Sequence, residues 1–248
     1  MGDQGYKVNH GTWDSVVNAL ANWSKLKMIR ETLYGTVFEK KTPSYKHRLH
    51  RRIIPFVPEN QKLSIPYMDA DRDTVRRTQT YKYIHENVRP VEMFNYMVIG
   101  NWFSAIALAI FGFFLLVLSQ FSFGRKILTE YPHIITFGQF SKDGPTREQV
   151  LSTSAEMLVV GKGYKNKMST PEEEPAYPPG EVTKTLKIKV PDPGYVATST
   201  LMNQAAVTLI QDRDKIPFKG GVLTPGLVFP NTSLVQRLGK HNITFEEI

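Results

Sequence analysis

A run of 32 residues without a charged side chain, Met93–Gly124, constrains this chain more than any other feature. Of the 21 residues from Val98 to Leu118, 13 are Val, Ile, Leu or Phe. As an α-helix this stretch would be about 31 Å long at about 1.5 Å per residue, close to the hydrocarbon thickness of a bilayer. A core helix of a soluble domain rarely needs more than about 14 wholly apolar positions. The segment therefore predicts membrane association.

Two arrangements of this segment remain open from the sequence. A single helix would have aromatic residues near its start and Arg125 with Lys126 after its end, where interfacial anchors are expected. A hairpin turning at Gly112 would have two arms of about 21 Å each, but its turn would need its backbone polar groups satisfied internally. In either arrangement, we expect these residues to insert into the membrane: Trp102, Phe103, Phe111, Phe113, Phe114, Leu115 and Leu116.

Charge divides the chain into three parts. Residues 1–92 carry 16 basic and 10 acidic side chains, and residues 125–248 carry 15 and 13. We therefore expect a basic N-terminal region with a helix and a proline-rich basic loop (1–92), a membrane-associated segment (93–124) and a C-terminal α/β domain (125–248). The formal net charge is +8.

Helix and strand signals alternate outside the apolar segment. Apolar spacing predicts a helix from Thr12 to about Leu33, with Thr12 and Ser15 offering N-cap chemistry, and a short helix capped by Asp73. The C-terminal part predicts a T-x-x-Q capping box at Thr146 and two strands that look antiparallel. The remaining predicted elements there are the strands 154–160 and 183–190, an exposed loop at 165–180, a turn at 192–195, a helix begun by Thr198 or Ser199, a last helix begun by Asn231 or Ser233, and a strand at 243–248. This order favours an α/β or α+β fold with a mixed sheet and flanking helices.

Several classes of chemistry find no support in the residues. The absence of cysteine excludes disulfide scaffolds, thiolate metal sites, iron–sulfur clusters and cysteine nucleophiles. The six histidines show no metal-ligand spacing, and no G-x-S-x-G elbow occurs. Gly161-Lys162-Gly163 lacks the third glycine and the following helix of a dinucleotide fingerprint, so a turn that ends a strand is expected there. We assign no metal site and no catalytic residue.

Two basic features have more than one interpretation. The run Lys46–Arg52 fits a solvated loop or a contact with anionic lipid headgroups. It does not favour nucleic acid, because it lacks interleaved aromatic residues. Arg76 and Arg77 could contact an anionic substrate, but ion pairs with the nearby Asp69, Asp71 and Asp73 are the favoured explanation.

An ordered set of short motifs resembles one family along essentially the whole chain. The motifs are His10-Gly11-Thr12, Ser64-Ile65-Pro66-Tyr67-Met68, Val75-Arg76-Arg77-Thr78-Gln79, Phe140-Ser141-Lys142-Asp143-Gly144-Pro145-Thr146, Gly161-Lys162-Gly163-Tyr164, Gly194-Tyr195-Val196-Ala197-Thr198 and Gly221-Val222-Leu223-Thr224-Pro225-Gly226. Together they resemble the C-terminal half to two thirds of saccharopine dehydrogenase-like oxidoreductases, in the animal membrane-associated branch. The uncharged segment falls where that branch carries its hydrophobic insertion.

The resemblance implies a cofactor and a location. Full-length relatives begin with a Rossmann domain that binds NAD(P), and the chain starts at about the end of that domain. We therefore expect no cofactor site in this chain, which would be a fragment, a short isoform or a truncated gene model. The resemblance also implies lipid droplets, the endoplasmic reticulum or the mitochondrial membrane, with most of the chain facing the cytosol. A similarity to bacterial trans-acting enoyl reductases makes a lipid-like substrate plausible, with Arg76, Arg77 and Tyr195 as possible substrate contacts.

Two functional hypotheses follow. The chain is part of a membrane- or droplet-associated oxidoreductase of lipid or glycolipid metabolism, or it is a non-enzymatic membrane scaffold derived from this family.

Overall fold

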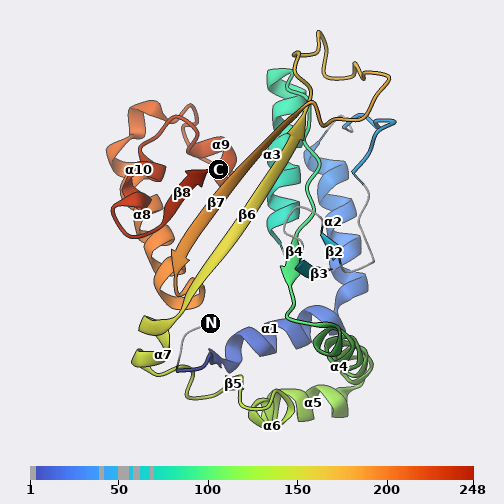
Figure 1. Ribbon diagram of the computed structural model, residues 1–248, viewed down its shortest axis with the longest axis vertical. Helices are drawn as coiled ribbons and strands as arrows, with labels where there is room; N and C mark the ends of the chain where they lie inside the picture. Colours follow the sequence, from blue (N-terminus) through green and yellow to red (C-terminus); the bar gives the residue numbers. More distant parts are fainter. Residues whose placement is uncertain (1–3, 39–41, 50–55, 58–61, 68–69) are drawn as a thin grey trace.

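The computed structural model describes residues 4–38, 42–49, 56–57, 62–67 and 70–248 (Figure 1). In this part of the chain the strands form three small sheets instead of one large one. The sheets have the strand orders β1-β5, β2-β3-β4 and β6-β7-β8. Only the two-residue pair β1–β5 is parallel among the described strands. The expected combination of helices and strands is confirmed, but the expected single mixed sheet is wrong, because each larger sheet is antiparallel throughout.

The lower tier of Figure 1 contains the apolar segment and the helices that hold it. Its elements are β1 (Val8–Asn9), α1 (His10–Ala21), α4 (Trp102–Gln120), α5 (Ser122–Glu130), α6 (Pro132–Ile135) and β5 (Phe140–Ser141). Trp13, Val17, Leu115 and Leu128 form a buried cluster, and Phe111 packs against it. The Trp13 indole donates a hydrogen bond to the Leu128 carbonyl at 2.7 Å. The core of this tier therefore lies between α1, α4 and α5.

The second tier stands above α1. Its elements are α2 (Trp23–Val37), β2 (Phe56–Val57), β3 (Lys62–Pro66), α3 (Asp71–Glu86) and β4 (Tyr96–Val98). Arg30 of α2 pairs with Asp73 of α3 at 3.2 Å. The Arg76 guanidinium lies 4.8 Å from the centre of the Tyr34 ring. These contacts hold α2 and α3 side by side (Figure 1).

The third tier is a long antiparallel sheet with helices at one end. Its elements are α7 (Arg147–Ser152), β6 (Ser154–Gly163), β7 (Val182–Pro191), the π-helix η1 (Pro193–Ala197), α8 (Thr198–Gln211), the 3₁₀ helix η2 (Arg213–Lys215), α9 (Pro225–Val228), α10 (Leu234–Gly239) and β8 (Thr244–Glu247). Ala197, Leu238 and Ile243 form the buried cluster between these helices and the sheet. The two predicted strands pair along ten residues, from Ser154 opposite Pro191 to Gly163 opposite Val182.

The N-terminal helix differs from its prediction. A break at Asn22 divides it into α1 and α2. The cap of α1 is the Asn9 side chain, which accepts from the Gly11 backbone N–H at 3.0 Å. Thr12 therefore lies inside the helix and not at its cap. The second short helix begins at Asp71, with Asp73 already in its first turn.

The caps of the C-terminal helices also differ in part. The capping box of Thr146 and Gln149 is confirmed by both of its hydrogen bonds. Before α8, however, the Asp192 carboxylate accepts from the Tyr195 backbone at 2.6 Å and so begins η1. The predicted Thr198 cap is therefore wrong, because the preceding π-helix runs directly into α8.

Two predicted turns or loops form more contacts than expected. Gly161 and Gly163 pair with β7 as part of β6, so the expected turn there is wrong. Residues 165–180 do form the connection between β6 and β7. Glu174 in this connection accepts hydrogen bonds from the Lys46 and His47 backbones at 2.5 and 2.6 Å. The described part of the basic run is thus bound to it, and residues 50–52 of the run lie outside the described residues.

The apolar segment forms one continuous helix. Gly112 lies within α4, so the hairpin alternative is wrong. The Asn101 side chain accepts from the Ser104 backbone at 2.8 Å and begins the helix. By length and composition α4 is long and apolar enough to cross a membrane, and only 11% of its most apolar window is buried.

The turn from α4 to α5 requires a glycine at position 124. A Cβ on Gly124 would lie 2.2 Å from the Leu118 carbonyl oxygen, whereas a Cβ on Gly112 would meet no atom within 4 Å. We therefore expect Gly124→Ala to lower the free energy of unfolding by about 1–3 kcal/mol, because the backbone of the turn must move. Gly112→Ala is the matched control and should raise it by roughly 0.5–1 kcal/mol, as expected inside a helix. Urea denaturation of both variants checks this, and equal effects would contradict the assigned turn.

Candidate functional site

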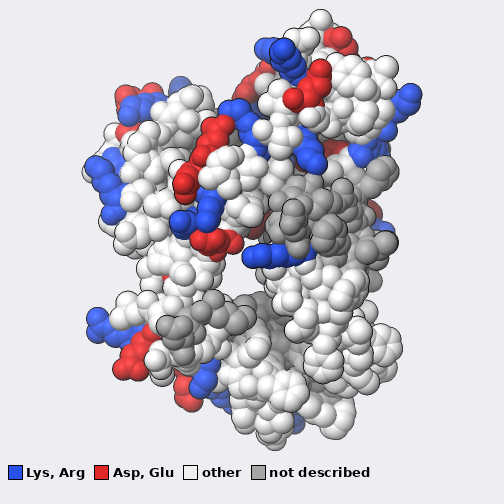
Figure 2. All heavy atoms as spheres, in the orientation of Figure 1, with Lys and Arg blue, Asp and Glu red and all other residues white. Residues whose placement is uncertain are grey.

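An apolar surface covers the outward side of α4 and continues beyond its end. Phe103 is 81% exposed, and Phe137, just after α6, is 92% exposed. Figure 2 shows that the surface over the lower tier at the right is almost without charged atoms. We define this apolar surface by its exposed large side chains: Trp102, Phe103, Ile106, Ile110, Phe113, Phe114, Leu116, Val117, Leu118, Phe121, Phe123, Ile134 and Phe137.

The opposite side of α4 faces the protein. Leu115 and Ser119 are buried, and the Phe111 ring lies 6.0 Å from the Trp13 ring. The Gln120 side chain donates to the Leu20 carbonyl at 3.3 Å. Of the seven residues expected to insert into a membrane, Phe111 and Leu115 therefore point toward α1, and the other five lie on the apolar surface.

Sequence reasoning missed the part of this surface that lies beyond α4. Ile134 and Phe137 follow the charged residues of α5, and those charges end the uncharged run Met93–Gly124. The signal that could have found them is the apolar spacing after Tyr131. Arg125 has a role that was also not predicted. Its guanidinium donates to the Ser119 and Gln120 carbonyls at 2.9 and 3.1 Å, so it binds the C-terminal end of α4.

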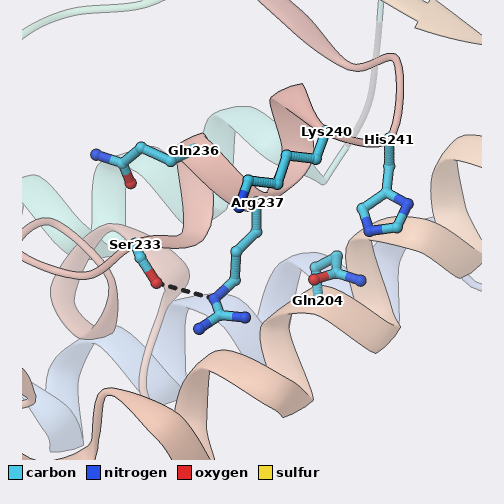
Figure 3. Close-up of a pocket in the computed structure, with 6 residues that line it drawn as sticks. All are labelled: Gln204, Ser233, Gln236, Arg237, Lys240 and His241. Atoms are coloured by element: carbon cyan, nitrogen blue, oxygen red, sulfur yellow. Dashed lines mark hydrogen bonds between the residues drawn. The ribbon is translucent and has the colours of Figure 1, made fainter.

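A small basic pocket lies between α8 and α10, with a volume of about 200 Å³. Figure 3 shows Arg237 in its middle, between the two helices. The lining residues are Gln204, Ser233, Gln236, Arg237, Lys240 and His241. Arg237 donates to Ser233 Oγ at 2.8 Å and to Gln211 Oε1 at 2.6 Å. The guanidinium is thus already used to join α10 to α8, and the pocket is smaller than most small-molecule sites.

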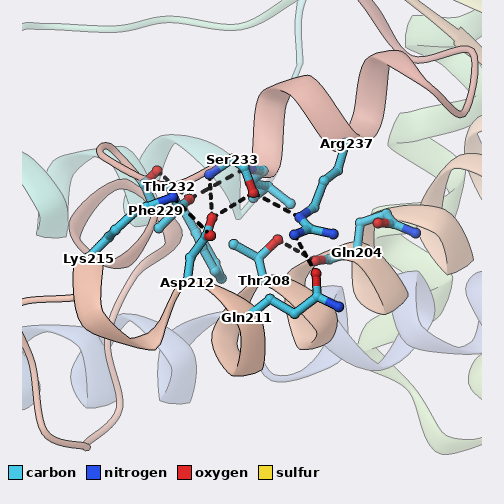
Figure 4. A network of polar contacts seen from close by, with 10 residues as sticks. Gln204, Thr208, Gln211, Asp212, Lys215, Phe229, Thr232, Ser233 and Arg237 are labelled. Carbon is cyan, nitrogen blue, oxygen red and sulfur yellow. Dashed lines mark hydrogen bonds and ion pairs between the residues drawn. The ribbon is translucent and has the colours of Figure 1, made fainter.

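The buried Asp212 carboxylate is the centre of the adjoining polar network (Figure 4). The Ser233 hydroxyl and backbone N–H each donate to Asp212 Oδ2 at 2.6 Å, and Lys215 Nζ lies 3.1 Å from Oδ1. The hydrogen bonds from Ser233, together with Lys215, hold the pKa of Asp212 well below its ordinary value. The network therefore fixes the start of α10 against the end of α8.

This low pKa predicts how stability depends on pH. The Asp212 carboxylate binds a proton less readily in the folded state than in the unfolded state. Its ionised form therefore stabilises the fold above about pH 4, and this stabilisation is lost as the pH falls further. Asp212→Asn should lower the urea midpoint of unfolding at pH 7. The difference in midpoint between the variant and the original protein should be smaller at pH 3. The exposed Asp214→Asn is the control and should change neither midpoint. A difference that stays constant with pH would contradict the assigned network.

A larger cavity of about 410 Å³ lies between α3 and α9. Its lining residues are Asp71, Thr74, Val75, Thr78, Gln79, Lys82, Pro225 and Gly226. Thr78 Oγ1 and Thr224 Oγ1 are 2.6 Å apart behind it. A Cβ on Gly226 would come within 2.9 Å of the Thr78 methyl group, so the two elements meet closely there. Its volume falls within the range of small-molecule sites, about 300–1,000 Å³.

The three residues that we considered as substrate contacts have separate surroundings. Arg76 stacks on Tyr34, and both Arg76 and Arg77 are exposed on α3, outside the cavity lining. The expected partner Asp73 pairs with Arg30. Tyr195 Oη accepts from the Asn9 backbone N–H at 2.8 Å. Their role in substrate binding stays a prediction.

The sequence pattern Gly161-Lys162-Gly163 does not form a dinucleotide turn in the structure. Within the described residues no group of three or more His, Asp or Glu side chains could hold a metal. A dinucleotide fingerprint needs a glycine turn between a parallel strand and a helix. Gly161 and Gly163 instead lie inside an antiparallel strand pair. No chemical step of this chain is therefore derived through a nicotinamide.

Comparison with known proteins places the chain among longer relatives. It is 36% identical over all 248 residues to the saccharopine dehydrogenase-like oxidoreductase of Homo sapiens, covering 56% of that protein. It is 29% identical to a Caenorhabditis elegans protein named lipid droplet localized protein, over 99% of this chain and 57% of the relative. A probable mitochondrial saccharopine dehydrogenase-like oxidoreductase of Arabidopsis thaliana is 29% identical over 97% of this chain and 56% of its own length.

These relatives confirm the resemblance drawn from the motifs. The chain spans about half the length of the curated relatives it matches. No family model matches the chain, and no solved structure gives a significant match.

Proposed function

We propose that this chain forms the membrane-binding and substrate-side portion of an oxidoreductase that acts at a phospholipid surface. The premise is that the whole chain is homologous to the saccharopine dehydrogenase-like oxidoreductases. The observation that carries this proposal is the apolar surface, whose large side chains face outward and whose main part lies on α4, a helix without a charged residue. A water-exposed patch of this kind marks an interaction with a membrane or another protein. The name of the C. elegans relative supports a lipid droplet as the location.

The substrate in this proposal is lipid-like. A substrate that partitions into a phospholipid surface would reach an enzyme held there by α4. The α3–α9 cavity is the candidate for its polar end, since threonine, glutamine and lysine side chains line it together with Val75 and Pro225. The nicotinamide dinucleotide that such an oxidoreductase requires would be held by a part of the full-length relatives that these 248 residues do not match.

Flotation with vesicles tests the membrane part of the proposal. The protein is mixed with phosphatidylcholine vesicles containing phosphatidylserine and centrifuged in a density gradient. Recovery with the vesicles supports membrane attachment, and recovery of all protein in the dense fractions overturns it.

Titration with NADPH and NADH tests the oxidoreductase part. The 248-residue chain and the full-length human relative are titrated in parallel, and binding is followed by nicotinamide fluorescence. Binding by the full-length relative alone supports the proposal. Binding by neither favours the second candidate function, a membrane scaffold, for which the supporting observation is that Gly161 and Gly163 lie in an antiparallel strand pair and not in a dinucleotide turn. Binding by the 248-residue chain would overturn the assignment of the cofactor to another part of the relatives.

A further inference from the structure

Both ends of α4 return to the same folded body. At its start, β4 pairs with β3, and the Ile99 backbone N–H donates to the Leu63 carbonyl at 2.8 Å, three residues before the helix begins. At its end, α5 packs on α1 through Leu128. A helix that crosses a bilayer must leave its two ends on opposite sides, about 30 Å apart.

The elements at the two ends are also joined to each other. Only Asn22 separates α1 from α2, and Arg30 of α2 pairs with Asp73 of α3. Arg72 of α3 in turn donates to the Met93 carbonyl at 3.0 Å, just ahead of β4. Crossing the bilayer would therefore require either breaking these contacts or drawing α1, with its polar side chains, into hydrocarbon. The second alternative is costly because charged and polar groups lose their hydration there.

The side chains of α4 divide into two stripes along its length. The inward stripe, Ser104, Leu108, Phe111, Leu115 and Ser119, is half-buried or buried at every position. The outward stripe is exposed and apolar at every position, from one end of the helix to the other: Phe103, Ile106, Ile110, Phe113 and Val117. Helical residues three or four apart lie on one face, so one long side of the helix faces the protein and the other faces away from it.

We propose that α4 lies in the plane of a single phospholipid leaflet, with its outward stripe immersed and its inward stripe on α1, and that it does not cross the bilayer. This inference rests on the proposed membrane attachment. An interfacial helix buries its apolar face about 5–10 Å into the boundary between headgroups and acyl chains. In most such helices the opposite face is polar and meets water, whereas here it meets the protein.

Lipid fits this surface better than a polypeptide does. Protein–protein interfaces contain polar and apolar area in similar shares, but the outward stripe offers no hydrogen-bonding side chain. The apolar surface also continues past α4 through the exposed Phe123, Ile134 and Phe137. These residues belong to α5, to α6 and to the residues after α6, and both helices lie with α4 in the lower tier of Figure 1. The exposed Lys126 on α5 lies 3.8 Å from the exposed Glu130, and an anionic headgroup would compete with this carboxylate for the ammonium group. A single leaflet is also all that a lipid-droplet monolayer provides.

Immersion depth distinguishes the in-plane helix from a crossing one. Because the chain has no cysteine, Phe103→Cys, Ile110→Cys and Val117→Cys each supply one site for a spin label. These positions are seven residues apart on one stripe, so an in-plane helix places all three labels at the same depth in phosphatidylcholine–phosphatidylserine vesicles. A crossing helix places the Ile110 label about 10 Å deeper than the other two at about 1.5 Å per residue. The exposed Met202→Cys on α8 is the control and should stay fully accessible to a water-soluble nickel relaxant.

Labelling from one side provides the second measurement. Val91→Cys and Leu151→Cys lie at exposed positions before and after α4. With protein added to sealed vesicles, a membrane-impermeant maleimide should label both to the same extent before and after detergent. Protection of either cysteine until detergent is added, or a deeper label at Ile110, overturns the in-plane arrangement while leaving membrane attachment in place.

Failure of attachment itself has a different signature. If the labelled proteins do not float with vesicles, the proposed membrane function fails and the in-plane arrangement fails with it. If, in addition, the three α4 labels are shielded from the relaxant without lipid and the protein elutes as a dimer, the occupant of the apolar surface is a second copy of the chain.

Discussion

Replacing Phe113 and Leu116 with arginine should release the protein from phospholipid vesicles. Both side chains lie on the apolar surface, 61% and 47% exposed. An arginine costs about 2.5–3.5 kcal/mol at the centre of a membrane and less near its surface. Even about 1.4 kcal/mol for each arginine would weaken partitioning about 100-fold for the pair. Flotation of the double variant with vesicles measures the effect.

The control for this variant adds the same charge elsewhere. Met202 and Ile210 on α8 are 71% and 78% exposed, so Met202→Arg with Ile210→Arg should fold and float as the original protein does. Circular dichroism of both double variants checks the fold, which should persist because none of the four positions is buried. If the double variant Phe113→Arg with Leu116→Arg still floats with the vesicles, α4 is not the anchor. The anchor is then the basic run Lys46–Arg52 or a bound partner.

Trp13→Ala should have the largest effect on stability of any substitution considered for this chain. The Trp13 side chain is buried at the meeting point of α1, α4 and α5. Its ring lies 6.0 Å from Phe111 and 5.4 Å from Phe140, and its indole binds the Leu128 carbonyl. Removing a buried tryptophan costs about 3–5 kcal/mol, which is a large part of the stability of an ordinary domain. Urea denaturation followed by circular dichroism measures the change.

Two further variants separate the contributions of Trp13. Trp13→Phe keeps an aromatic ring but removes the donor to the Leu128 carbonyl. It should therefore lower the free energy of unfolding by about 1–3 kcal/mol, less than Trp13→Ala does. Trp23→Ala removes an exposed indole at the first residue of α2 and should change the free energy of unfolding by less than about 0.5 kcal/mol. Equal losses for Trp13→Ala and Trp23→Ala would contradict the assigned core.

Local signals predicted much of the secondary structure. The strand pair β6–β7 and the capping box of Thr146 follow from spacing within a few residues. The uninterrupted apolar run predicted a helical segment, but it left open whether that segment is one helix or a hairpin. The caps were predicted less well, because several side chains near a helix start can accept the same N–H groups. Asn9 and Asp192 took that role in place of Thr12 and Thr198.

The inward side of α4 could not be predicted from the sequence. In a segment with almost no polar residue, no periodic pattern distinguishes the side that meets protein from the side that meets lipid. Phe111 and Phe113 are the same residue type, and only the position of Trp13, about a hundred residues earlier, decides which one is covered. The Asp212 network depends likewise on Ser233, 21 residues further along the chain.

The long separation between some bonded residues determines the order in which the parts of the chain can fold during synthesis. The Asn9 backbone bonds to Tyr195, 186 residues later, and β1 pairs with β5. Contacts of such long range are slow to form, and at about 5–20 residues per second the ribosome needs many seconds to deliver the partner. The helix α4 emerges in that interval, when α1 is already available but α5 is not. Its inward stripe, which α1 and α5 cover together in the folded structure, is therefore only partly covered until α5 has emerged.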